Sequence, residues 1–118
     1  MNRWNDSINN IVQSKDKVTK IQIINYTPSC ETKYDVEREK YDDYIKFMKS
    51  VEVAPCNDEP LSGISTQFTV LYKDETEFRA LFTGKYINID NKYFYEIQNY
   101  SEVENTYNDL ILLKNTKT

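Results

Sequence analysis

The stretch that decides the fold is TQFTVLYKDETEFRALFTGKYINIDNKYFYEI, residues 66–97. Apolar and polar side chains alternate in four short runs, and short polar segments separate these runs. A period of two is typical of half-buried strands, and short turns join antiparallel neighbours. The stretch therefore predicts an antiparallel meander of four strands, over residues 66–72, 76–82, 86–89 and 93–97.

Two further elements are predicted before this meander. A helical spacing of apolar residues indicates a short amphipathic helix over residues 5–14, with Trp4, Ile8, Ile11 and Val12 on its apolar face. Residues 17–25 are rich in β-branched side chains that alternate with polar ones, which predicts a strand. The N-terminal part of the chain thus supplies one helix and one strand.

Helical periodicity returns in the middle of the chain and again near its end. Residues 35–50 predict a long helix, with Thr32 and Asp35 as a capping box at its start. Ser101 and Glu104 form a second capping box, which predicts a C-terminal helix. The apolar stripes of the two helices are Tyr41, Tyr44, Ile45, Met48 and Val51, and then Val103, Tyr107, Leu110 and Ile111.

The order of these elements predicts an α+β domain. We expect a single antiparallel sheet of about five to six strands, including a short one over residues 51–54, with the helices packed on one face. A chain of 118 residues with 39% hydrophobic and 29% charged residues fits one globular domain. The expected domain covers residues 1–118, with frayed ends at 1–4 and 114–118.

Composition argues against several classes of function. The chain has no histidine and only two glycines, so histidine-dependent nucleophiles, most zinc sites and glycine-rich phosphate loops are disfavoured. A net charge of −4 disfavours nucleic-acid binding. The longest apolar run, residues 110–113, is too short to span a membrane. We expect no catalytic residue, no cofactor, no metal ion and no nucleic-acid partner.

The two cysteines are candidates for a disulfide. Cys30 and Cys56 lie in predicted loops at the two ends of the central helix. A helix of this length is about 24 Å long, so pairing requires the flanking segments to fold back along it. A bridge would be typical of an exported protein, whereas two unpaired thiols would fit a cytosolic one, and both alternatives stay open. A catalytic cysteine is disfavoured because no histidine is present to generate its thiolate.

Two candidate binding surfaces emerge from the sequence. Tyr86, Tyr93 and Tyr95 come from neighbouring predicted strands and would form an aromatic strip on the exposed sheet face. Cross-strand pairing that only stabilises the sheet is the simpler explanation of these tyrosines, and we favour it over a binding role. Asn57 and Asp58 lie in the predicted loop over residues 55–63. This acidic loop lacks the ligand spacing of a calcium-binding loop, so we interpret it as solvated.

Several segments together resemble a known family. The motif Asn57-Asp58-x-Pro60 and the run Gly84–Tyr86 carry most of the resemblance, which covers roughly residues 8–110. The chain is similar to an uncharacterised family of extracytoplasmic domains found in lipoproteins of low-GC Gram-positive bacteria. This resemblance implies a fold like one half of TATA-binding protein, with a curved sheet and helices on its convex side. It implies no activity, and the export signal and lipid anchor of such a lipoprotein would lie upstream of Met1.

These observations support two hypotheses. The first is a noncatalytic binding module, exported or tethered at the surface of a Gram-positive bacterium, that binds a protein or cell-envelope partner. The second is a cytosolic acidic inhibitor or immunity-type protein that binds a basic partner. An enzyme comes third, since only carboxylate, tyrosine or lysine chemistry would be open to it.

Overall fold

The computed structural model describes residues 3–56, 65–90 and 92–112. Within these residues, one sheet of seven antiparallel strands has the order β2-β1-β4-β5-β6-β7-β3. The strands are β1 (Val18–Tyr26), β2 (Glu31–Asp35), β3 (Val53–Pro55), β4 (Ser65–Tyr72), β5 (Glu77–Thr83), β6 (Tyr86–Ile89) and β7 (Tyr93–Ile97). The helices are α1 (Arg3–Gln13), α2 (Tyr41–Ser50) and α3 (Tyr100–Tyr107), and a π-helical turn, Asn108–Leu112, continues α3.

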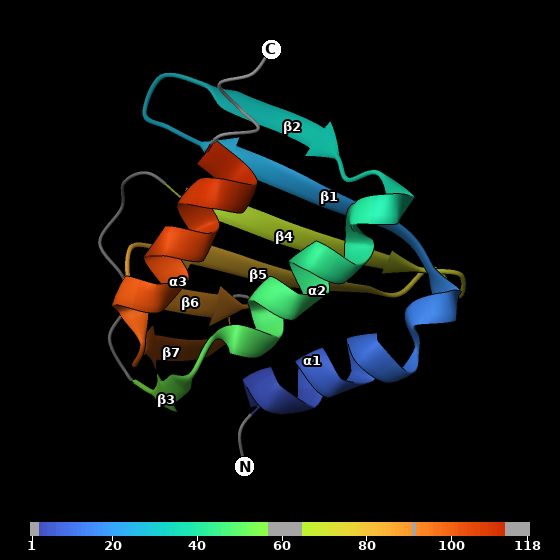
Figure 1. The fold of residues 1–118 in the computed structure, drawn as a ribbon, viewed down its shortest axis with the longest axis horizontal. Helices are drawn as coiled ribbons and strands as arrows, with labels where there is room; N and C mark the ends of the chain where they lie inside the picture. The colour runs from blue at the N-terminus through green and yellow to red at the C-terminus, as the bar shows by residue number, and fades with distance from the viewer. Residues whose placement is uncertain (1–2, 57–64, 91, 113–118) are drawn as a thin grey trace.

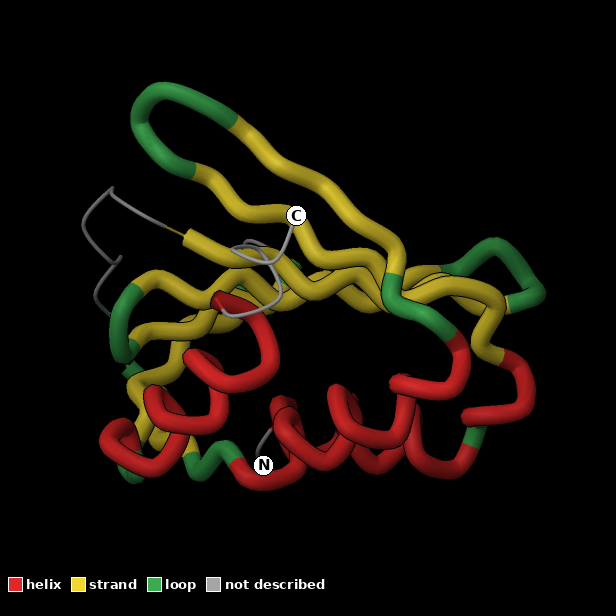
Figure 2. The backbone as a smooth tube through the Cα atoms, turned by 45° about the horizontal axis from the view of Figure 1, so that its top comes forward, coloured by secondary structure: helices red, strands yellow, loops and turns green. Residues whose placement is uncertain are grey.

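The three α-helices all lie on one face of the sheet (Figure 1). Seen closer to edge-on, the described helices form one layer and the strands a second, and the far face of the sheet carries no described helix (Figure 2). This two-layer α+β architecture confirms the predicted fold class, with one strand more than expected. The predicted meander is present as β4, β5, β6 and β7, each hydrogen-bonded to the next.

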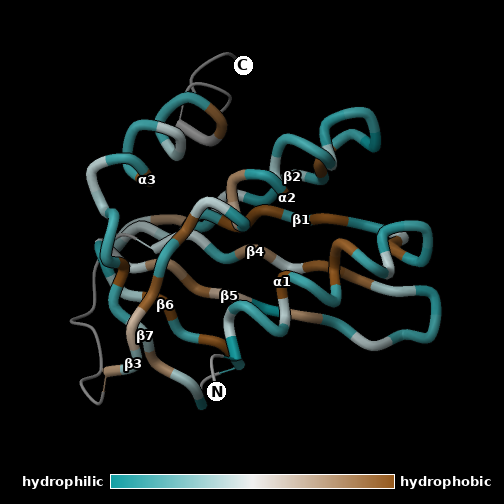
Figure 3. Tube along the Cα trace, turned by 60° about the horizontal axis from the view of Figure 1, so that its bottom comes forward, coloured by the Kyte–Doolittle hydropathy of each residue, from teal (hydrophilic) through white to brown (hydrophobic). Residues whose placement is uncertain are grey.

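The core lies between the two layers and is centred on β4. Phe68 lies opposite Ile23 of β1 and Ala80 of β5, and all three are 0% exposed. Hydrophobic residues accordingly recur along β1, β4 and β5, while the helices are mostly hydrophilic with isolated hydrophobic positions (Figure 3). Trp4 and Phe47 bring large side chains from α1 and α2 to this core. The sequence predicts a frayed end over residues 1–4, but burial of the Trp4 indole fixes it in the fold.

The long central helix was predicted to begin too early. Glu31–Asp35 is strand β2, which pairs with β1 through a hairpin, and α2 begins only at Tyr41. Thr32 and Asp35 therefore lie in a strand and cap no helix. The ladder to β1 explains the difference, because the Val36 amide also bonds to the Ile21 carbonyl at 2.8 Å. Tertiary hydrogen bonding thus overrides a helical pattern of charged residues.

The second capping box is also absent from the structure. α3 begins at Tyr100, so Ser101 lies inside the first turn and Asn99 occupies the N-cap position. The Asn99 amide donates from Nδ2 to the Ser50 carbonyl at 2.8 Å, and its Oδ1 accepts from the Glu52 amide at 3.0 Å. Asn99 therefore ties the start of α3 to the segment between α2 and β3.

The predicted disulfide is wrong, because Cys30 and Cys56 are not bonded to each other. Cys30 lies in the β1–β2 hairpin, and Cys56 follows β3 at the opposite edge of the sheet. Five strand spacings, roughly 24 Å in total, separate β1 from β3. A disulfide needs Cα atoms within about 7 Å, so this topology keeps the two thiols apart.

Candidate functional site

The three tyrosines of the predicted aromatic strip do not share one surface. Tyr86 lies opposite Glu96, whereas Tyr95 lies opposite the buried residue Ile87. Residues directly opposite each other across a sheet share a face, and neighbours along a strand alternate. Tyr86 is therefore on the uncovered face, while Tyr93 and Tyr95 point to the helix-covered face. Tyr95 is only 4% exposed.

Tyr93 and Tyr95 instead hold the N-terminus of α1. The Tyr95 hydroxyl accepts from the Arg3 amide at 3.0 Å, and the Tyr93 hydroxyl accepts from Arg3 Nη2 at 2.9 Å. The guanidinium carbon also lies 4.4 Å from the centre of the Tyr93 ring, which is a cation–π contact. Both tyrosines thus stabilise the fold. The other predicted residues, Asn57 and Asp58, lie outside the described residues.

The uncovered sheet face is mixed in character. Its apolar side chains include Leu71, Leu81, Tyr86 and Phe94, which are half-buried. Ion pairs lie on the same face, including Lys85–Glu96 at 3.4 Å and Arg79–Glu77 at 3.3 Å. An antiparallel sheet with one solvated face commonly looks like this. The uncovered sheet face is therefore a weaker candidate for a binding site than a concave surface.

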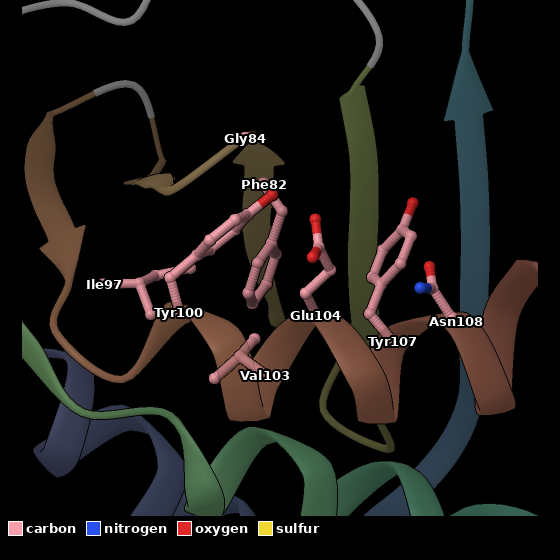
Figure 4. A pocket seen from close by; sticks show the side chains of 8 residues that line it. All are labelled: Phe82, Gly84, Ile97, Tyr100, Val103, Glu104, Tyr107 and Asn108. Carbon is pink, nitrogen blue, oxygen red and sulfur yellow. The ribbon is translucent and has the colours of Figure 1, made fainter.

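A concave surface does exist, between α3 and the sheet. It is a cavity of about 260 Å³. The helix side contributes Tyr100, Val103, Glu104, Tyr107 and Asn108, and the sheet side contributes Phe82, Gly84 and Ile97. Figure 4 shows the Glu104 carboxylate between the rings of Tyr100 and Tyr107, and all three side chains project from α3 toward the strands.

Helical spacing explains how α3 builds this wall. Tyr100, Glu104 and Tyr107 stand at positions i, i+4 and i+7, which lie on one face of a helix. Val103 lies beside them, is buried, and packs α3 onto the core. Glu104 is exposed and the two tyrosines are half-buried, so the cavity opens to solvent.

A hydrogen bond fixes the ring of Tyr107. Its hydroxyl bonds to Thr66 Oγ1. Thr66 Oγ1 itself donates to Asn25 Oδ1 at 2.9 Å, so the Tyr107 hydroxyl is the donor to Thr66. Burial raises the pKa of Tyr107, and burial together with the neighbouring Glu104 carboxylate raises the pKa of Tyr100. Both hydroxyls are therefore protonated at neutral pH.

The chemistry of the cavity suits recognition of a polar or positively charged group. Glu104 is the one carboxylate among the described residues that line it, and no described basic side chain lines it. Aromatic faces and the apolar side chains of Ile97 and Val103 form the remaining wall. Such a concave, mostly apolar surface with few convergent polar groups is the usual form of a small-ligand site.

Sequence reasoning missed this site, although a signal was present. Glu104 was assigned to a capping box, Tyr107 to the apolar stripe of the C-terminal helix, and Tyr100 to no role. The recurrence of tyrosine, glutamate and tyrosine at i, i+4 and i+7 marks a second stripe on that helix, distinct from Val103. That stripe predicts which face of the helix forms the cavity wall, but it does not predict which strands lie opposite that face.

The chain matches no family model, no curated protein and no solved structure. The resemblance to extracytoplasmic domains with a fold like half of TATA-binding protein therefore stays a prediction. In the part of the chain that the structure describes, no helix is both long and apolar enough to cross a membrane.

Proposed function

We propose that this protein is a noncatalytic binding module whose binding site is the cavity between α3 and the sheet. The observation that carries the proposal is the cavity itself, with two tyrosine rings around a single carboxylate and the Tyr107 hydroxyl held by Thr66. A mostly apolar wall with a few convergent polar groups is typical of small-ligand sites. General acid–base catalysis commonly uses groups whose pKa lies near the operating pH. The pKa of Tyr100 is raised further above that range, which favours a binding role for this side chain.

The size of the cavity limits its occupant. The cavity has a volume of about 260 Å³. Sites for drug-sized ligands begin at about 300 Å³. The occupant is therefore a small molecule or a single side chain of a larger partner.

The same proposal extends to location and partner. We propose an exported or surface-tethered protein that binds a protein or cell-envelope component, and the support is the family resemblance together with the absence of an evident catalytic motif. The separation of Cys30 and Cys56 removes the disulfide argument for export. Detection of the protein in the cytosolic fraction of its host, with none at the surface, would contradict this location.

An acidic inhibitor of a basic partner is the second candidate. Two observations favour it, namely the net charge of −4 and the carboxylate in the cavity. Complementary charge steers association, so binding of such a partner should weaken steeply as salt is added. A complex that is insensitive to salt would contradict this alternative.

A plugged variant tests the proposed site. Asn108→Phe adds bulk to the cavity wall, whereas Asn105→Phe adds the same bulk at an exposed position of α3. We expect small polar fragments to shift backbone amide resonances of residues 97–108 in the wild type and in the Asn105 variant, but not in the Asn108 variant. Fragments that bind equally well to all three proteins would show that the site lies elsewhere.

A further inference from the structure

We propose that the cavity recognises an alkylammonium group, either as a free small amine or as the end of a lysine side chain. Glu104 would supply the opposite charge, and the rings of Tyr100 and Tyr107 would flank the alkyl stem and the cation (Figure 4). This inference rests on the proposed function and names the ligand class of the same site.

The first argument concerns charge. The ion pairs of the described residues join Lys15 to Asp42, Lys20 to Asp35, Arg79 to Glu77 and Lys85 to Glu96, and none includes Glu104. None of these ion pairs thus supplies a cation to the Glu104 carboxylate, which lies in a partly apolar cleft. A carboxylate in such surroundings attracts a cation more strongly than one in open water does.

The second argument concerns the aromatic rings. A cation within about 6 Å of an aromatic ring centre is attracted by the ring quadrupole, and cages of aromatic side chains recognise ammonium groups in this way. Tyr100 and Tyr107 stand on either side of Glu104 (Figure 4). Elsewhere the same chain places the ammonium nitrogen of Lys85 5.8 Å from the Tyr86 ring centre.

The third argument excludes the competing cations. Calcium takes six to eight oxygen ligands and magnesium takes six, whereas the described cavity wall offers one carboxylate with a few neutral oxygens. A guanidinium group prefers a bidentate pair with both oxygens of a carboxylate. The described part of the cavity wall offers only one carboxylate, at an exposed position beside Tyr100. An ammonium group is a compact point charge that does not need the planar, two-oxygen geometry of a guanidinium pair.

Calorimetric titration with n-butylammonium tests the inference. Matched probes are 1-butanol, which is neutral, and N-butylguanidinium, which is planar. Nα-acetyl-lysine amide carries the ammonium on an amino-acid backbone. We expect n-butylammonium to bind at least about tenfold more tightly than 1-butanol, which lacks the charge, and than N-butylguanidinium, whose planar group prefers a bidentate pair with a carboxylate. Tighter binding of the lysine amide would identify a side chain of a partner, and tighter binding of n-butylammonium a free amine.

Two glutamate variants provide the control. Glu104→Gln keeps the shape of the side chain but removes the charge, and we expect it to weaken n-butylammonium at least about tenfold. Glu102→Gln removes the same charge from an exposed position of α3 outside the cavity, and we expect no change. Circular dichroism checks that both variants fold.

The failures of the two proposals are distinguishable. If 1-butanol binds as tightly as n-butylammonium, or Glu104→Gln binds as well as the wild type, the ammonium inference is overturned while a site in the cavity survives. If the probes bind nowhere, or bind equally to the Asn108→Phe variant, both proposals are overturned.

Discussion

Phe68 shows at the scale of one residue how the core is held. Its ring centre lies 5.2 Å from that of Phe82, 5.6 Å from that of Phe47 and 6.5 Å from that of Tyr44. These rings come from β5 and α2, so Phe68 of β4 is one of the contacts through which the helix layer meets the sheet.

Replacement of Phe68 by alanine should therefore be severe. We expect Phe68→Ala to lower the free energy of unfolding by about 3–5 kcal/mol, because it leaves a cavity among packed rings. Tyr86→Ala, on the uncovered face, should cost about 1 kcal/mol or less. Urea denaturation monitored by circular dichroism measures both, and equal losses in the two variants would contradict the described layers.

Buried tyrosines predict how stability depends on pH. Burial raises the pKa of Tyr34, Tyr44 and Tyr107, and for Tyr34 the neighbouring Tyr44 adds to the effect. The hydroxyl of a tyrosine in the unfolded chain ionises near pH 10, whereas these three hydroxyls stay protonated in the folded protein to a higher pH. Their contribution to stability is thus complete below about pH 10 and is lost as the pH rises further.

We expect the free energy of unfolding in urea to fall between pH 9 and pH 11.5. Tyr34→Phe removes one of the ionising hydroxyls, so the fall should be smaller in that variant. A free energy of unfolding that stays constant or rises over this range, or a fall that Tyr34→Phe leaves unchanged, would show that these hydroxyls are not buried as described.

At the scale of elements, the start of α3 differs between the sequence-based prediction and the structure. The pattern predicts a cap at Ser101, whereas the structure gives Asn99 two side-chain hydrogen bonds to the backbone between α2 and β3. We expect Asn99→Ala to destabilise by about 1–3 kcal/mol, because it leaves two backbone groups without these partners. Ser101→Ala should change the free energy of unfolding by about 0.5 kcal/mol or less. The reverse order in urea denaturation would support a cap at Ser101.

Elements with an apolar face could be predicted, and those without one could not. β4 and β5 alternate large apolar side chains with polar ones, so their strands follow from sequence alone. The side chains of β2 are all exposed except that of Tyr34, which is half-buried. β2 is a strand because β1 offers it a ladder of hydrogen bonds, and the sequence of residues 31–35 does not contain that information.

At the scale of the whole molecule, the strand register explains why the predicted aromatic strip does not form on one face of the sheet. The turn after β6 places Asp90 at φ 53° and pairs Ile89 with Tyr93. A shift of one residue in such a turn moves every following side chain to the other face. The sequence indicates the turn but leaves this register open. The cavity likewise exists only after α3 folds back on β5 and β7.

Sheet order also predicts the behaviour of the thiols. Because β1 and β3 are far apart, we expect the purified native protein to keep both cysteines reduced, with the intact mass of a dithiol. A reducing agent should leave its melting temperature unchanged. A mass about two daltons lower, together with a lower melting temperature after reduction, would show a disulfide and contradict this strand order.

The central claim is that this protein recognises its partner in the cavity between α3 and the sheet. Intermolecular nuclear Overhauser effects between bound n-butylammonium and the full chain test it most directly. We predict cross-peaks from the butyl protons to the rings of Tyr100 and Tyr107. Cross-peaks confined to the uncovered sheet face, for example to Tyr86 and Phe94, would contradict the claim, as would their complete absence at saturating n-butylammonium.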